Sequence, residues 1–135
     1  MTIPTRPVPQ ISPESLPFWD GCKAGRLLMQ HCAACGQINW FPRRFCAHCG
    51  ADDFSWKECA GTGVLETFSI VYRPMNEAWA GEVPYVVAVV RLDEGPRMVT
   101  RIIRHDDREP RMDARVRVRF VPIEGGFQLP YFEEV

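Results

Sequence analysis

The 135-residue chain has very little lysine, no long apolar run and none of the common catalytic motifs. Its two lysines stand beside fourteen arginines, and its net charge is −1. This balance gives no overall positive field that would attract nucleic acid or an anionic membrane. No stretch approaches the roughly 20 apolar residues of a transmembrane helix, and no signal peptide is visible. We therefore expect a cytoplasmic protein without a membrane contact.

Signatures of catalysis are missing as well. The sequence contains no glycine-rich phosphate loop, no Gly-x-Ser-x-Gly turn and no His-Glu-x-x-His motif. Two of the three histidines, His31 and His48, border or lie inside cysteine motifs, where they serve as exposed spacers. His105 lies in a charged segment that is typical of a solvated turn. We assign no catalytic residue and expect a binding or assembly module.

Four cysteines form the most informative motif that is present. Cys32 and Cys35 make one Cys-x-x-Cys pair, Cys46 and Cys49 make a second, and ten residues separate the two pairs. A glycine follows each pair and allows the backbone to bend sharply. Two such pairs at this spacing predict a closed four-cysteine zinc site of the ribbon type, and a closed site is structural rather than catalytic. Iron in the same thiolate shell, and disulfides in a secreted chain, are the alternatives.

The first half of the chain predicts one helix and a ribbon. Residues 1–12 are rich in proline and predict an extended arm. Ser12 followed by Pro13 is typical of a helix start, and Gly25 marks the expected end. Residues 27–31, 38–41 and 54–59 predict short strands around the cysteine pairs. Cys22 and Cys59 lie outside the paired motif, and we expect them to be buried thiols without a chemical role. We therefore assign residues 13–60 to the helix and zinc ribbon.

The second half, residues 61–135, predicts a small β-domain. The expected strands span 64–72, 85–92, 97–103, 115–120 and 127–132. In the first of them Val64, Phe68, Ile70 and Tyr72 alternate and are predicted to face inward. Five short strands with a longer connection between the third and the fourth predict a Greek-key barrel of the OB-fold type. The chain as a whole is thus expected to be mainly β.

Arginines are concentrated near the C-terminal end. Eight of them fall between Arg97 and Arg119, against four acidic residues, which leaves a local balance of about +4. Because the guanidinium group binds phosphate and carboxylate through a planar fork, this surplus fits an anionic ligand or an acidic partner. A solvated strand face explains it equally well.

The order of motifs resembles a known family, the acyl-CoA-associated proteins that join a rubredoxin-like zinc ribbon to an OB-fold. The resemblance extends from about residue 13 to the C-terminus. It rests on Pro17-Phe18-Trp19, Gly25-Arg26-Leu27-Leu28, the two Cys-x-x-Cys-Gly pairs, Pro42-Arg43, Gly61-Thr62-Gly63-Val64-Leu65 with Phe68-Ser69, Pro84-Tyr85-Val86-Val87-Ala88-Val89-Val90 and Asp93-Glu94-Gly95-Pro96.

The resemblance implies an accessory subunit that is not an enzyme by itself. Members of the family assemble with thiolase-superfamily enzymes, including thiolases, hydroxymethylglutaryl-CoA synthase and aldolases that shorten steroid side chains, in lipid, steroid or aromatic degradation. The implied features are a structural Zn²⁺, an acyl-CoA ligand shared with a thiolase-like catalytic subunit, and a hetero-oligomer. Some members are fused to a hydratase-like domain, and the present chain is expected to be a free-standing form.

Two sets of residues follow as binding candidates. Aromatic anchors dominate interface energies, so Phe18, Trp19, Trp40 and Phe41 are predicted to pack on the partner, unless they fill an internal core between helix and ribbon. OB-folds bind ligands across one face of the barrel. We accordingly predict contacts to the CoA phosphates or adenine from Arg73, Tyr85 and Arg101.

Two other function classes compete with this interpretation. Zinc ribbons and OB-folds also occur in modules that bind single-stranded nucleic acid, although those combine a positive groove with aromatic platforms, and this chain is slightly negative. An autonomous thioesterase or a rubredoxin-type electron carrier is the second alternative. Oligonucleotide binding, unaided acyl-CoA hydrolysis and a red iron-containing preparation are the observations that distinguish them.

Overall fold

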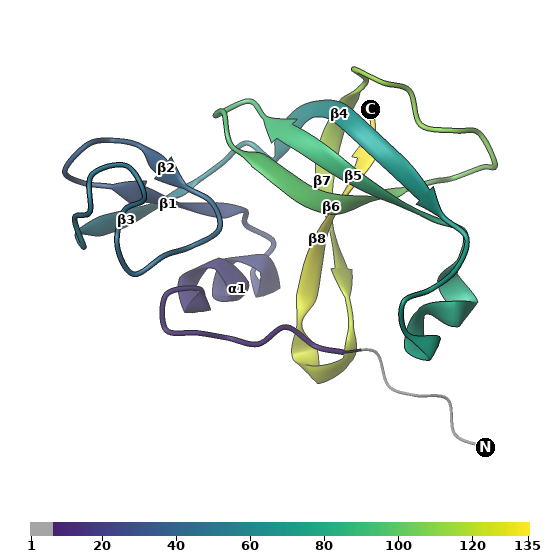
Figure 1. Cartoon of the computed structure of the whole chain (residues 1–135), viewed down its shortest axis with the longest axis horizontal. Coiled ribbons are helices and arrows are strands. Elements are labelled where there is room, and N and C mark those ends of the chain that lie inside the picture. The colour runs from purple at the N-terminus through teal and green to yellow at the C-terminus, as the bar shows by residue number, and fades with distance from the viewer. Residues whose placement is uncertain (1–6) are drawn as a thin grey trace.

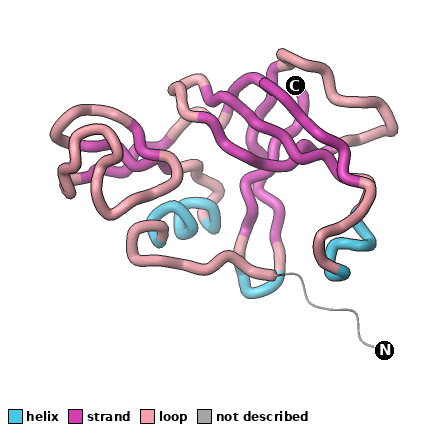
Figure 2. The backbone as a smooth tube through the Cα atoms, in the orientation of Figure 1, coloured by secondary structure: helices cyan, strands magenta, loops and turns pink. Residues whose placement is uncertain are grey.

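The structure is a computed structural model that describes residues 7–135, in which a small ribbon and a barrel flank a single α-helix (Figure 1). The elements are α1 (Leu16–Lys23), β1 (Leu28–Cys32), β2 (Ile38–Asn39), β3 (Phe54–Glu58), β4 (Thr62–Val71), η1 (Glu77–Glu82), β5 (Tyr85–Leu92), β6 (Arg97–Ile103), β7 (Arg115–Pro122), η2 (Glu124–Gly126) and β8 (Gln128–Glu134). Strands and loops make up most of the chain (Figure 2). The expected mainly-β class is confirmed.

The start of the chain follows the expected order with one shift. The first six residues of the predicted arm lie outside the described residues, and residues 7–11 form neither helix nor strand. Ser12 caps a first turn, because its Oγ accepts a hydrogen bond from the backbone N–H of Ser15 at 3.2 Å. The regular helix begins only at Leu16, three residues later than predicted. It ends before Gly25, whose φ of 76° lies in the left-handed region that favours glycine.

Strands β1, β2 and β3 form an antiparallel sheet in the order β2-β1-β3, and this sheet is the ribbon. The expected strand at 38–41 is shorter than predicted, since its pairing to β1 ends at Asn39. The Asn39 side chain bonds the second cysteine loop, and the backbone beyond Asn39 is no longer paired with β1.

The second half is a closed barrel with the strand order β4-β5-β6-β8-β7, and β7 returns to β4. All pairs are antiparallel except β6 with β8, which closes the barrel through Ile102 opposite Phe132. This is the Greek-key barrel that the sequence predicts. In β7, valine and arginine alternate along the strand, so Val116 is fully buried while Arg115 and Arg117 are exposed.

The predicted inward face of β4 is wrong at both ends. A register shift between Leu65 and Thr67 inserts an extra residue, Glu66, into the strand. Because side chains alternate across a strand, one inserted residue exchanges the two faces. Leu65 is therefore fully buried in place of Val64. Tyr72 is 70% exposed for a different reason, because it lies beyond Val71, the last residue of β4. Beyond the shift, the predicted packing of Phe68 and Ile70 against the core is confirmed.

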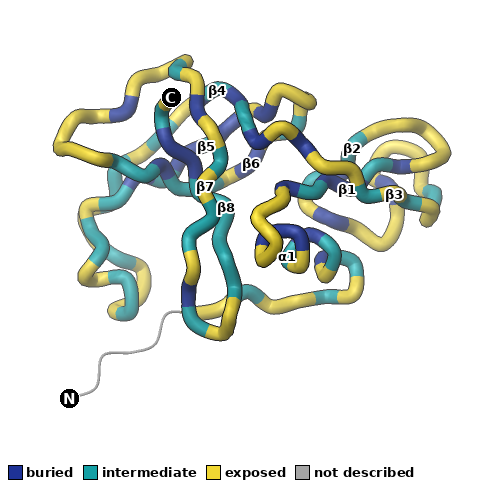
Figure 3. Tube along the Cα trace, turned by 180° about the vertical axis from the view of Figure 1, so that it is seen from behind, coloured by how far each residue is buried: buried dark blue, intermediate teal, exposed yellow. Residues whose placement is uncertain are grey.

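One buried cluster connects the helix, the ribbon and the barrel. Phe18 and Cys22 of α1 and Met29 of β1 share it with barrel residues such as Val86 and Phe132. Buried positions run through α1 and the barrel strands alike (Figure 3). At the C-terminal end of α1, the Gln128 side chain donates hydrogen bonds to the carbonyls of Cys22 and Lys23 at 3.3 and 2.9 Å. The helix is thus held on two sides.

Candidate metal centre and aromatic groove

The four paired cysteines converge on one point at the end of the ribbon. All four sulfur atoms lie within 4.8 Å of one another. Cys32 and Cys49 are 3.6 Å apart, and Cys35 and Cys46 are 3.7 Å apart. Sulfurs at the corners of a tetrahedron, each about 2.3 Å from a zinc ion, lie about 3.8 Å apart. The donor set and its spacing therefore fit a four-cysteine zinc site.

Each cysteine pair is shaped by a backbone turn that ends in glycine. The N–H of Gly36 bonds the carbonyl of Cys32, and the N–H of Gly50 bonds the carbonyl of Cys46, both at 2.9 Å. Gly36 and Gly50 have φ values of 78° and 79°. An L-residue rarely adopts that conformation, so the glycines that were read from the sequence have a direct structural reason.

A second layer of hydrogen bonds orients the Cys46 sulfur. The Asn39 Nδ2 donates to Cys46 Sγ at 3.4 Å, and its Oδ1 accepts from the Ala47 N–H at 2.9 Å. The His48 N–H donates to the same sulfur at 3.4 Å. These donors, Asn39 first, lower the pKa of Cys46 to about 5 and favour the thiolate that binds metal. Asn39 was not identified from the sequence, where its signal is a polar residue in an otherwise apolar segment.

A buried glutamine fixes the loop between the two cysteine pairs. Gln30 is 3% exposed, and its amide bonds the backbone of Arg43 twice. Its Nε2 donates to the Arg43 carbonyl at 2.7 Å, and its Oε1 accepts from the Arg43 N–H at 2.9 Å. The position of the loop is thereby set by side chains of the ribbon sheet.

The four aromatic residues predicted for the partner interface form one cluster. The ring of Phe18 lies 4.9 Å from Trp19, 4.9 Å from Trp40 and 6.1 Å from Phe41, in edge-to-face geometry. Phe18 is 1% exposed, whereas Phe41 is 44% exposed. Phe18 therefore belongs to the internal core, whereas Phe41 lies at the surface. Packing of these residues on a partner stays a prediction.

This cluster forms one wall of an apolar groove of about 570 Å³. The opposite wall belongs to strands β6 and β8 of the barrel. The lining residues are Phe18, Trp19, Trp40 and Phe41 on the first wall and Arg97, Met98, Val99, Thr100, Arg101, Leu129, Pro130 and Tyr131 on the second. The groove as a whole could not be read from the sequence, because its walls are about 60 to 110 residues apart along the chain.

Arg101 lines the groove and lies among three aromatic side chains. Its guanidinium carbon lies 4.1 Å from the centre of the Tyr85 ring, 5.1 Å from Tyr131 and 5.3 Å from Trp79. Its Nη1 also donates to Glu82 at 2.6 Å. Two of the three residues predicted to contact CoA, Arg101 and Tyr85, therefore meet. The third, Arg73, lies in the exposed bend after β4 and takes no part in these contacts.

The arginine surplus is largely balanced inside the chain. Each of the eight arginines donates to an acidic side chain or, for Arg104, to a backbone carbonyl. The pairs are Arg97 with Glu66, Arg101 with Glu82, Arg104 with the Pro84 carbonyl, Arg108 with Asp106, Arg111 with Glu134, Arg115 with Asp93, and Arg117 and Arg119 with Glu133. This arrangement favours the solvated strand face over a dedicated anion site.

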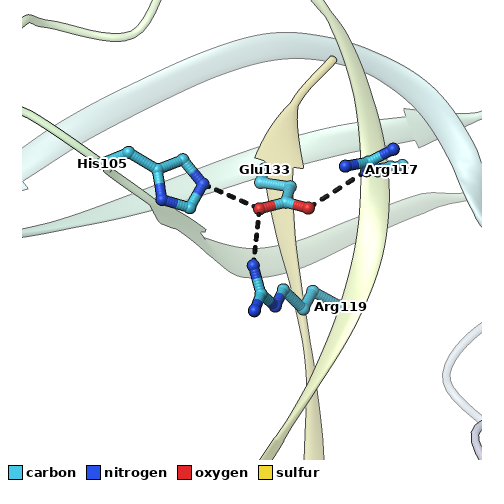
Figure 4. Close-up of polar contacts among 4 residues, drawn as sticks. All are labelled: His105, Arg117, Arg119 and Glu133. Carbon is cyan, nitrogen blue, oxygen red and sulfur yellow. Dashed lines mark hydrogen bonds and ion pairs between the residues drawn. The ribbon is translucent and has the colours of Figure 1, made fainter.

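A buried carboxylate was missed by the sequence analysis (Figure 4). Glu133 of β8 is 5% exposed and contacts His105 at 2.8 Å, Arg117 at 3.0 Å and Arg119 at 3.2 Å. The hydrogen bond from His105, followed by those from the arginines, lowers the pKa of Glu133 to about 2. The sequence predicted a solvated turn residue at His105. In the structure His105 also connects the loop after β6 to β8 through its contact with Glu133.

Two further expectations concern the cysteines outside the paired motif and the lack of a membrane-spanning segment. Cys22 and Cys59 are buried, as predicted, at 0% and 6% exposure, and burial raises the pKa of each thiol to about 12. Among residues 7–135, no helix is long and apolar enough to cross a bilayer.

Two family models match consecutive parts of the chain. The ChsH2 rubredoxin-like zinc ribbon domain matches residues 19–55, and the ChsH2 C-terminal OB-fold domain matches residues 56–121. Among solved structures, a chain of the Ltp2-ChsH2(DUF35) aldolase is similar over 94% of this chain and 98% of its own length, with 31% identity and a TM-score of 0.84. A DUF35 family protein of unknown function from Sulfolobus solfataricus shares the fold, with 14% identity and a TM-score of 0.60.

Curated relatives match over part of their length. A probable enoyl-CoA hydratase alpha subunit of Thermomonospora curvata is 39% identical over 98 residues, which are 73% of this chain and 30% of that protein. A DUF35 domain-containing scaffold protein of Methanocaldococcus jannaschii is 28% identical over 57% of this chain and 55% of its own length. The chain thus spans less than two thirds of the curated relatives to which it is similar.

Proposed function

Because the chain belongs to the ChsH2 family of proteins that join a rubredoxin-like zinc ribbon to an OB-fold, we propose that it is a scaffold subunit of an acyl-CoA enzyme. The enzyme would be an aldolase or a thiolase whose catalytic subunit is thiolase-like. The supporting observation is the similarity over almost the full length to a chain of the Ltp2-ChsH2(DUF35) aldolase. The name of the DUF35 domain-containing scaffold protein of Methanocaldococcus jannaschii agrees with this role.

The proposed metal is one structural Zn²⁺ held by Cys32, Cys35, Cys46 and Cys49. Protein sulfurs would fill all four positions, so the ion would keep no open position for water or substrate. Its contribution is to hold the two turns of a ribbon that has too little core to fold alone. We place the protein in the cytoplasm, where cysteines stay reduced, because none of its six cysteines forms a disulfide.

In this proposal the partner supplies the carbon–carbon bond chemistry, and the present chain helps to shape the shared acyl-CoA site. Contacts of CoA with Arg73, Tyr85 and Arg101 stay a prediction. To bind phosphate, Arg101 would have to release or share its ion pair with Glu82. The nucleic-acid alternative draws no support from the eight arginines between Arg97 and Arg119, since their partners lie within the chain. Single-strand binders present an uncompensated positive groove instead.

Co-expression with a thiolase-like protein, sought among the products of the neighbouring genes, tests the proposal. We expect the two proteins to co-purify by size exclusion and to cleave or condense acyl-CoA together, while this chain alone is inactive. Metal analysis of the complex should find one zinc per copy of this chain. Failure to co-purify, combined with full activity of the thiolase-like protein alone, would contradict the proposed role.

A further inference from the structure

The apolar groove has two walls that come from different parts of the chain. One wall is formed by α1 and the loop after β2, and the other by the outer face of β6 together with β8. An occupant of the groove would therefore contact the helix, the ribbon and the barrel at once. The groove is open to solvent along one side, so a segment of another molecule can enter without a change of fold.

The groove exposes large apolar side chains on both of its walls. Val99 in the middle of β6 is 72% exposed, and Phe41 on the facing wall is 44% exposed. Around them lie other apolar groups, including Leu129 and Pro130. Exposed aromatic and apolar residues around a concave site are the usual anchors of a protein interface, because covering them removes apolar surface from water.

The charges at the rim are already neutralised. Arg97 donates to Glu66 at 2.7 Å, and Arg101 donates to Glu82 at 2.6 Å. An anionic occupant would have to break one of these ion pairs to gain a new one, which offers little net attraction. An uncharged occupant leaves both pairs intact. Charge complementarity therefore favours a neutral, apolar occupant.

The ribbon wall is also held in place before anything binds. Phe18 is fully buried beneath Phe41 and Trp40. The loop that carries Phe41 is fixed at Arg43 by the double hydrogen bond from buried Gln30. A wall that needs no ordering loses less conformational entropy on association, so the groove is suited to rigid docking.

We propose that this groove receives an uncharged, apolar segment of the catalytic partner's polypeptide, with Val99 and Phe41 as the central contacts. The assignment rests on the proposed function and adds the face that docks and the chemistry of what it binds. In this proposal the ion pairs of Arg97 with Glu66 and of Arg101 with Glu82 stay intact on docking, and they do not bind a charge of the partner.

Paired variants of exposed residues test this assignment in the co-expressed complex. Val99→Glu places a charge inside the groove, while Met112→Glu places one at a residue that is 54% exposed and does not line the groove. Phe41→Ala and Phe45→Ala compare two exposed phenylalanines of one loop, of which only Phe41 lines the groove. We expect zinc content to stay at the wild-type value in all four variants, and melting temperature to stay near it in Val99→Glu, Met112→Glu and Phe45→Ala. Phe41→Ala loses edge-to-face contacts with Phe18 and Trp40 and should melt somewhat lower while it remains folded.

Affinity between the purified subunits is the readout, measured by surface plasmon resonance. We expect Val99→Glu and Phe41→Ala to weaken association about tenfold or more, and the two controls to stay within about twofold. Unchanged affinity of the groove variants would overturn the assignment while leaving the proposed function intact. Normal assembly with a raised KM for acyl-CoA would also overturn it, in favour of a substrate groove. If wild type does not associate at all, the proposed function fails and the assignment fails with it.

Discussion

Replacing Phe18 by alanine gives the most direct test of the aromatic cluster. The ring is 1% exposed and meets three other rings at centroid distances of 4.9, 4.9 and 6.1 Å. Burial on this scale makes Phe18 part of the core, although the same residue was also a candidate contact for the partner. Phe18→Ala should therefore act on stability first and on assembly only through stability.

The expected loss follows from the removed contacts. A buried Phe→Ala substitution costs about 3–5 kcal/mol, because the transfer energy of the ring is lost and a cavity remains. Each edge-to-face pair adds about 0.5–1.5 kcal/mol to the burial of its rings, so a value near the upper end is expected. For a chain of this length, that corresponds to a fall of about 10–20 °C in melting temperature.

Thermal and urea unfolding measure the effect, with Phe45→Ala as the matched control. Phe45 is 54% exposed, so its removal should change stability by no more than about 0.5 kcal/mol. Equal melting temperatures for the two variants would refute the reasoning. That result would mean that Phe18 is not buried between helix and ribbon in solution.

Three further outcomes are expected. Cys46→Ser should lose zinc and unfold the ribbon, because three thiolates leave the shell incomplete, whereas Cys22→Ser should keep one zinc per chain by metal analysis; retention of zinc by the first variant would contradict the site. Chelation of the metal should remove hydrogen-exchange protection mainly between residues 27 and 59 and leave it beyond Gly63; uniform loss would mean that helix, ribbon and barrel unfold as one unit. Glu133→Gln should lower the melting temperature at pH 7. Because the folded pKa of Glu133 is depressed to about 2, its contribution is full above the ordinary pKa near 4.5 and disappears toward pH 2. The difference between wild type and Glu133→Gln should therefore shrink over that interval, and a constant difference would exclude the ionic origin.

Local patterns were sufficient for most of the fold. Each Cys-x-x-Cys-Gly pair, the short apolar segment of β5 and the alternating valines and arginines of β7 can be recognised within a few consecutive residues, so each predicts its element without the rest of the fold. The β4 prediction failed because an inserted residue leaves no mark in an alternating sequence. Only the register with β5 shows that Glu66 is the extra residue.

The candidate site was predictable only where local residue types point to it, and not where it depends on contacts between distant positions. The sequence identified Phe18 and Phe41 by type, but it could not place β6 opposite them. Nor could it find the contacts around Glu133, because His105 and Arg117 reach it from positions 28 and 16 residues away. Asn39 shows an intermediate case, in which a polar residue among apolar neighbours was visible but had no partner until the second cysteine turn was placed beside it.

The support that β8 gives to α1 has a consequence for biosynthesis. Gln128 and Phe127, which contact the end of the helix and Trp19, follow the helix by more than 100 residues. At translation rates of about 5–20 residues per second, they emerge roughly 5–20 s after it. During that interval the nascent helix carries Phe18 and Trp19 without one of its two supports. A ribosome that stalls before Phe127 would thus display an aromatic surface of the kind that chaperones bind.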